Sequence, residues 1–172
     1  GISRVVVPTL DPDARVNGRG IRFLRERGIR ADVGTGADMA LLLNLPYFKS
    51  ALGLGPAVTL KMAVTLDGKI ASMPGRRDEM TGEHSRRMAH RLRAIHDGVA
   101  IGIDTLLTDK PRLDCRLLNG VGSPSPVVID PDLRFPPDHP WLAERDVFVV
   151  TLPDASQERE AALAGSGARV IR

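Results

Sequence analysis

A lysine and an aspartate stand in and just after an alternating stretch, where they could take part in ligand chemistry. From Val58 to Val64 apolar residues alternate with others, as in a half-buried strand, and Lys61 lies within this run. The following Asp67-Gly68 predicts a tight turn, because glycine readily adopts a positive φ. Such a strand would place Lys61 and Asp67 near the point where it leaves the sheet, a common place for ligands. A plain hairpin without chemical function is the alternative.

The histidines and the single cysteine do not predict a metal site or a nucleophile. His84, His90 and His96 are spaced six residues apart, which does not align ligands on one helix face, and His139 is remote in sequence. We therefore expect surface or capping histidines and no metal in this chain. Cys115 has no partner for an internal disulfide, so we expect a passive thiol in a reducing compartment. The sequence also lacks GxGxxG, P-loop, HExxH and CxxC motifs.

Composition places the chain among ordinary globular proteins. Its 172 residues are 42% hydrophobic and 26% charged, enough for one domain or slightly more, and no apolar run has membrane-spanning length. The net charge of +3 comes with an arginine-rich N-terminal region but few aromatic residues. A solvated arginine face explains this pattern better than a nucleic-acid site, which would interleave basic and aromatic groups. We expect a cytoplasmic protein that binds neither nucleic acid nor membrane.

Alternating strand and helix signals predict an α/β fold with a mostly parallel sheet and flanking helices. The expected strands are residues 2–7, 29–33, 58–64, 99–103, 126–130, 146–151 and 168–171, and the expected helices are 20–27, 37–44, 82–95, 105–109 and 155–164. Thr81 is the expected N-cap of the longest helix, and Met88, Leu92 and Ile95 its buried stripe. Residues 46–56, punctuated by glycine and proline, form the expected linker. A half-covered sheet predicts a homo-oligomer.

Two long segments, LKMAVTLDGKIAS and TGEHSRRMAHRLRAIHDGVAIGIDTLLTDKPRLDCR, together resemble the reductase domain of the bifunctional riboflavin-biosynthesis deaminase/reductase family. Residues 1–56 resemble the closing part of its deaminase domain. The resemblance implies a dihydrofolate-reductase-like α/β domain over residues 57–172, continuing beyond Arg172. It also implies that residues 1–45 are the closing α/β portion of a cytidine-deaminase-like domain. The zinc of that domain would be held upstream of Gly1, outside this chain.

The resemblance further implies NADPH-dependent reduction of the ribosyl side chain of 5-amino-6-(5-phosphoribosylamino)uracil to the ribityl form, in a parent that also deaminates the pyrimidine. By position, the expected cofactor contacts are Ala63, Thr105 and Asp109, and the expected contacts of the phosphorylated pyrimidine-ribose substrate are Arg93, Leu113 and Arg116. Arginine suits a sugar phosphate, because its planar fork donates two hydrogen bonds to one oxyanion. Lys61 and Asp109 are the candidates for delivering a proton.

Residues 75–81 depart from the family pattern, which usually has Gly-Glu-Ser-x-Trp-Ile-Thr there. Arg77 replaces a substrate-facing serine, and Glu79 replaces an aromatic residue beside the nicotinamide. A carboxylate cannot stack on that ring. The alternative function is therefore a catalytically impaired relative or scaffold segment that binds a nucleotide or a partner subunit.

Overall fold

The computed structural model describes residues 1–73 and 79–172, so Arg77 lies outside the described residues. The chain divides into an N-terminal unit, residues 1–60, and a C-terminal unit, residues 61–172. Among the described residues, no helix combines the length and the apolar character needed to cross a membrane.

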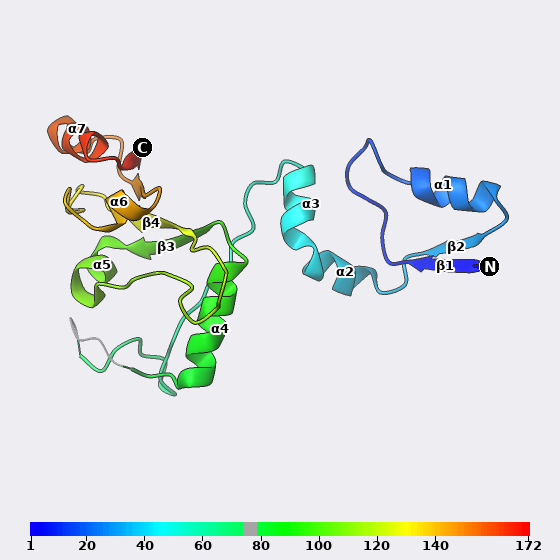
Figure 1. Ribbon diagram of the computed structural model, residues 1–172, viewed down its shortest axis with the longest axis horizontal. Coiled ribbons are helices and arrows are strands. Elements are labelled where there is room, and N and C mark those ends of the chain that lie inside the picture. Colours follow the sequence, from blue (N-terminus) through cyan, green and yellow to red (C-terminus); the bar gives the residue numbers. More distant parts are fainter. Residues whose placement is uncertain (74–78) are drawn as a thin grey trace. The chain divides into compact units, whose positions relative to one another are not determined.

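The N-terminal unit is a small parallel β-α-β arrangement followed by two helices (Figure 1). Strand β1 (Arg4–Val7) pairs in parallel with β2 (Arg30–Val33), and α1 (Arg19–Glu26) connects them. Helices α2 (Ala37–Leu43) and α3 (Leu45–Ala51) follow. The predicted strands and helices of this region are confirmed, whereas α3 forms within the first half of the expected linker.

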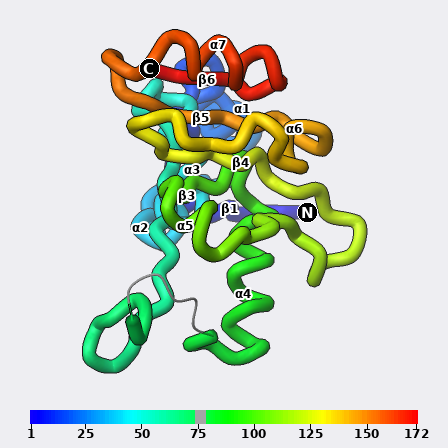
Figure 2. The backbone as a smooth tube through the Cα atoms, turned by 90° about the vertical axis from the view of Figure 1, so that its left-hand side faces the viewer, coloured from blue at the N-terminus to red at the C-terminus, as the bar shows by residue number. Residues whose placement is uncertain are grey.

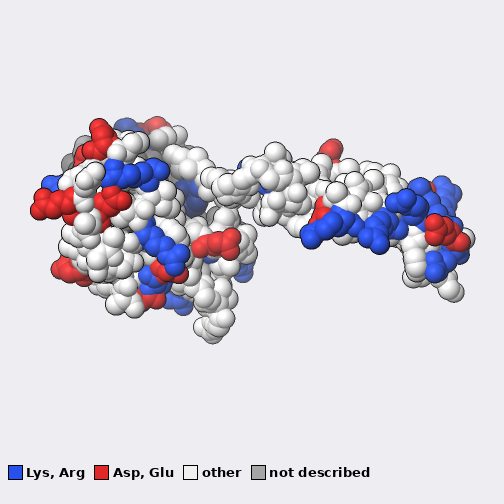
Figure 3. Space-filling view, turned by 90° about the horizontal axis from the view of Figure 1, so that it is seen from above, with Lys and Arg blue, Asp and Glu red and all other residues white. Residues whose placement is uncertain are grey.

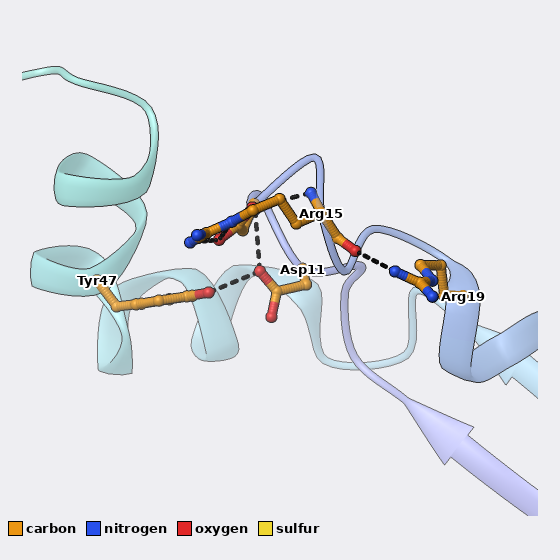
Figure 4. A network of polar contacts seen from close by, with 5 residues as sticks. Asp11, Arg15, Arg19 and Tyr47 are labelled. Carbon is orange, nitrogen blue, oxygen red and sulfur yellow. Dashed lines mark hydrogen bonds and ion pairs between the residues drawn. The ribbon is translucent and has the colours of Figure 1, made fainter.

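A polar network joins the loop after β1 to helix α3 (Figure 4). The hydroxyl of Tyr47 donates to Oδ1 of Asp11 over 2.7 Å, and the backbone N–H of Asp13 donates to the same oxygen over 2.9 Å. The Arg15 side chain hydrogen-bonds Asp13 and lowers the pKa of that carboxyl to about 2. Arg19 donates to the carbonyl of Arg15 over 3.1 Å. Basic side chains form several patches on the visible surface of this unit (Figure 3).

The C-terminal unit is built on a four-stranded sheet with the order β3-β4-β5-β6, every neighbouring pair parallel (Figures 1 and 2). Its strands are β3 (Gly98–Gly102), β4 (Ser125–Ile129), β5 (Phe148–Val150) and β6 (Arg169–Ile171). Its helices are α4 (Glu83–Ala94), α5 (Ile103–Asp109), α6 (Trp141–Glu144) and α7 (Gln157–Gly165). The α/β class, the parallel sheet and four of the predicted strands are thus confirmed.

The core of this unit lies where β4 and β5 meet the helices. Val128 of β4 and Val149 of β5 are fully buried. Leu106 of α5, Trp141 of α6 and Leu163 of α7 pack in the same cluster. Buried residues alternate with half-buried ones along β4 and β5, and their short apolar runs made both strands recognisable from sequence.

The strand predicted at residues 58–64 is wrong. These residues form no strand, and Val58 and Leu60 expose 84% and 82% of their surface. An alternating pattern makes a strand only when a neighbour accepts its backbone hydrogen bonds and a layer covers its apolar face. This stretch belongs to neither sheet of the described residues, and its large apolar side chains are exposed. The Asp67-Gly68 turn does form, with Gly68 at φ 78° and its N–H donating to the Thr65 carbonyl over 2.9 Å.

Two predictions for helix α4 are also wrong. Gly82, not Thr81, occupies the N-cap position. Met88 and Ile95 are exposed, and His90 is the buried residue of the helix, with 4% of its surface accessible. The helix turns this face inward because it packs against the loop that carries Cys115, whose thiol lies 3.9 Å from the His90 carbonyl oxygen.

Candidate substrate and cofactor site

The two arginines predicted to bind the substrate reach the same residue. Arg93 lies in the last turn of α4, and its Nη1 donates to the carbonyl oxygen of Asp114 over 3.1 Å. Nη1 of Arg116 lies 2.5 Å from Oδ1 of Asp114. Nε of Arg112 lies 2.9 Å from the other carboxylate oxygen. The structure therefore gathers three guanidinium groups around one residue, although only two of them were predicted.

Asp114 is ionised by its neighbours in spite of partial burial. Burial alone would raise the pKa of this carboxyl, but the hydrogen bond and charge of Arg116, with the charge of Arg112, outweigh it and lower the pKa below its usual value. Burial in turn lowers the pKa of Arg93, and the Asp114 carboxylate opposes that shift. The cluster has more cations than anions, which is the composition that an oxyanion site requires.

The loop that carries this cluster has an unusual backbone. Lys110 and Leu113 adopt positive φ, at 44° and 49°. A non-glycine residue in this conformation costs about 1–2 kcal/mol, so other contacts must hold the loop. Arg145, which follows α6, supplies them: its Nη2 donates to the Arg112 carbonyl over 2.8 Å and its Nη1 to the Leu113 carbonyl over 3.2 Å. Leu113, a predicted substrate contact, is buried with 5% of its surface accessible.

A cavity of about 990 Å³ opens beside this loop. Its lining includes Arg112, Asp114, His139, Trp141 and Arg145. Its volume lies within the range of small-molecule sites, roughly 300–1,000 Å³. Asp114 belongs both to the arginine cluster and to this wall, so the two features adjoin.

His90 lies beside the arginine cluster and was not predicted as a site residue. Its Nδ1 is buried and has no hydrogen-bond partner among the described residues. Burial lowers its pKa first, and the charges of Arg93 and Arg116 lower it further, while Asp114 opposes them. The expectation of a surface or capping histidine is wrong for this residue. One sequence signal could have found it: His90 precedes Arg93 by three positions, so both lie on the same helix face.

The predicted cofactor contacts Thr105 and Asp109 lie on α5. This helix starts directly at the carboxyl end of β3, where parallel α/β sheets bind ligands. Their i, i+4 spacing places the two side chains on one face, roughly 6 Å apart at Cβ. Thr105 is exposed and Asp109 half-buried. The loop with the arginine cluster begins immediately after Asp109, so α5 connects the two groups.

Lys61 and Ala63 lie in the irregular stretch where the strand was expected, Lys61 exposed and Ala63 half-buried. Neither residue therefore lies on a strand as predicted. Glu79 pairs with Arg86 of α4, whose Nη1 lies 3.5 Å from its carboxylate. Among the described residues, no group of three or more histidine, cysteine or acidic side chains could hold a metal ion.

Comparison with known proteins gives a consistent answer over nearly the whole chain. The chain is 34% identical over 171 residues to the riboflavin biosynthesis protein RibD of Aquifex aeolicus, covering 99% of the chain and 48% of that protein. It is also 34% identical over 185 residues to the chloroplastic riboflavin biosynthesis protein PYRR of Arabidopsis thaliana, covering 99% of the chain and 30% of that protein. The chain therefore spans about half the length, or less, of these curated relatives.

Solved structures of RibD proteins also match the chain. Acinetobacter baumannii RibD (form 1) matches with a TM-score of 0.76 and 32% identity, over 99% of this chain and 48% of that one. The diaminohydroxyphosphoribosylaminopyrimidine deaminase/5-amino-6-(5-phosphoribosylamino)uracil reductase of Thermotoga maritima matches with a TM-score of 0.74 and 28% identity, over 99% and 54%. Residues 56–171 match the family described as the RibD C-terminal domain. With its parallel sheet and its matches to RibD proteins, this chain belongs to the RibD C-terminal domain family.

Proposed function

We propose that this chain contributes the reductase of riboflavin biosynthesis, which uses NADPH to reduce the ribosyl side chain of 5-amino-6-(5-phosphoribosylamino)uracil. The family match over residues 56–171 supports the reaction class. The observation that carries the substrate assignment is the convergence of Arg93 and Arg116 on Asp114. These guanidinium groups would bind the substrate phosphate, and Leu113 would contact the substrate beside them.

The residues of α5 fit a nicotinamide cofactor. The Thr105 hydroxyl and the Asp109 carboxylate lie on one helix face at the carboxyl end of β3, and both can hydrogen-bond ribose or amide groups. Bound NADPH would supply the hydride. The chain would position the substrate carbon against it, Ala63 would leave room for the ring, and Asp109 or Lys61 would deliver the proton.

Two further proposals concern the N-terminal residues and the oligomeric state of the parent protein. We propose that residues 1–45 close a deaminase-like domain of the parent protein, whose zinc site belongs to residues outside this chain. We also propose that the parent self-associates.

A direct test measures NADPH oxidation by the whole chain with the pyrimidine substrate, together with a thermal shift on adding NADPH. Arg93→Gln should raise the KM for the substrate at least about tenfold, because a hydrogen bond to a charged group contributes about 1.5–3 kcal/mol. Arg91→Gln, in the same helix turn but exposed, is the matched control and should leave KM unchanged. A chain that neither binds NADPH nor oxidises it with substrate contradicts the proposal.

The alternative of an impaired relative is supported by Glu79, which cannot stack on a nicotinamide and pairs with Arg86 instead. Glu79→Trp distinguishes the two. A large gain in NADPH oxidation on this substitution supports the impaired site, whereas strong turnover by the native chain removes that alternative.

A further inference from the structure

His90 is buried where α4 packs against the loop that carries Cys115, and it is not part of the hydrophobic core. It is 4% exposed, on a helix whose other residues are partly or fully exposed. Its Nδ1 is buried without a hydrogen-bond partner among the described residues. Burying a polar nitrogen without a partner is unfavourable, and most such groups in folded proteins have one. The ring nitrogen of His90 therefore lacks the partner that such buried groups usually have, although it lies beside a cluster of charged groups.

The charged groups around His90 come from two elements. Arg93 lies one turn further along its own helix, and Arg116 and Asp114 lie on the loop packed against it. Cys115 of that loop contacts the His90 carbonyl oxygen through its thiol, which fixes the loop beside the histidine. Burial and the two arginines favour the neutral ring, and Asp114 opposes them.

We infer that His90 is a third member of the anion site formed by Arg93 and Arg116, and that it takes up a proton when a divalent oxyanion binds there. The inference rests on the proposed function in that the substrate phosphate would be the natural anion. A bound dianion cancels the repulsion that the two guanidinium groups exert on a protonated ring. The protonated imidazole then donates hydrogen bonds from both nitrogens, so the unpartnered Nδ1 becomes a donor.

Thermodynamic linkage makes the coupling between proton uptake by His90 and anion binding measurable. If anion binding raises the pKa of His90 by about one unit, the anion must bind about tenfold more tightly to the protonated form. Affinity should therefore increase as the pH falls from about 8 to about 5, the range in which histidine titrates. Asp114 stays ionised over this range because its pKa is lowered, so it does not produce this dependence.

Sulfate is the suitable probe, because it keeps both charges over this range and any proton taken up must be on the protein. The chain has four histidines, so their imidazole NMR signals can be assigned with single glutamine variants. His139 is the internal control. Burial also lowers its pKa, but the charged groups acting on it are Asp138, Arg145 and Glu144.

Titrations of the whole chain with and without sulfate should show the His90 pKa rising by about one unit and that of His139 unchanged. In His90→Gln, sulfate should still bind, with affinity independent of pH over this range. Arg116→Gln should abolish the rise, whereas Arg91→Gln should retain it. Sulfate binding that leaves the His90 pKa unchanged overturns the inference, and so does a His90→Gln variant with the wild-type pH dependence. Failure of sulfate to bind overturns it as well, while NADPH binding by thermal shift tests the reductase assignment separately.

Discussion

Replacing Asp114 by asparagine should destabilise the C-terminal unit by about 1–2 kcal/mol at neutral pH. The carboxylate is 16% exposed and pairs with Arg112 and Arg116, whose side chains are 73% and 51% exposed. Because both arginines lie largely in solvent, each pair should contribute no more than about 0.5–1 kcal/mol. Asparagine keeps the shape and removes the charge, so the loss reports these pairs.

The pH dependence gives the prediction its sharpest form. The pKa of Asp114 is lower in the folded chain than its ordinary value of 3.8, so its contribution is fully present above that value. As the pH falls through the folded-state pKa, the Asp114 carboxylate is protonated while the arginines stay charged, so both ion pairs and their contribution to stability are lost. The difference between wild type and Asp114→Asn should therefore shrink below about pH 4.

Urea unfolding followed by tryptophan fluorescence is the appropriate assay. Trp141 is the only tryptophan and is buried in the core of the C-terminal unit, so its signal reports that unit. Asp146→Asn is the matched control, because Asp146 and its partner Arg169 are both more than 60% exposed, and it should change stability by less than about 0.5 kcal/mol. Equal stability of Asp114→Asn and wild type at neutral pH would refute the reasoning, as would a difference that persists unchanged at low pH.

Three further predictions test the sheet, the proposed cofactor site and the N-terminal network. Val149→Ala should lower the unfolding free energy of the C-terminal unit by about 2 kcal/mol in the same assay, since Val149 is fully buried. Val58→Ala should have almost no effect, because Val58 is exposed. A comparable loss of stability at Val58 would contradict the structure and support a strand there. Thr105→Val should weaken NADPH binding about threefold to tenfold by titration, and Thr108→Val, exposed on the same helix, should not; equal effects would remove Thr105 from the cofactor site. Tyr47 is the only tyrosine, and its hydrogen bond to Asp11 raises its pKa above 10.0, so the absorbance of phenolate should appear at higher pH than in a free tyrosine. Asp11→Asn should shift that titration back, and an unshifted wild-type titration would contradict the network.

Local sequence signals were sufficient for elements that have clear ends. Strands β3 to β6 were predicted because each is a short apolar run bounded by turn residues, and α1 because Gly18 and Gly28 bracket it with positive φ. Residues 58–64 failed for the opposite reason. Their pattern specifies a strand only in the presence of a neighbouring strand, and whether one is present is a tertiary property.

The site was only partly accessible from sequence. The positions of Arg93 and Arg116 were carried by the family resemblance, but no local pattern shows that both reach Asp114. Arg145 was missed because its partners lie in a distant segment: it bonds carbonyl oxygens 32 and 33 residues earlier in the chain. A backbone carbonyl is present in every residue, so the type of the accepting residue does not reveal the hydrogen bond. In the sequence Arg145 therefore cannot be distinguished from a surface arginine.

The tether from Arg145 means that the sequence from Pro111 to Arg116 does not by itself encode the shape of the loop. The left-handed Leu113 is held by the Arg145 guanidinium group, which the chain supplies only after α6 and which bonds the carbonyl oxygens of Arg112 and Leu113. Transplanting the hexapeptide onto another scaffold would therefore transfer its side chains without their arrangement, unless a donor equivalent to Arg145 were transferred with it. The arrangement of residues 111–116 thus depends on two distant segments of the chain. Transfer of these six residues alone would lose the geometry that gathers the arginines.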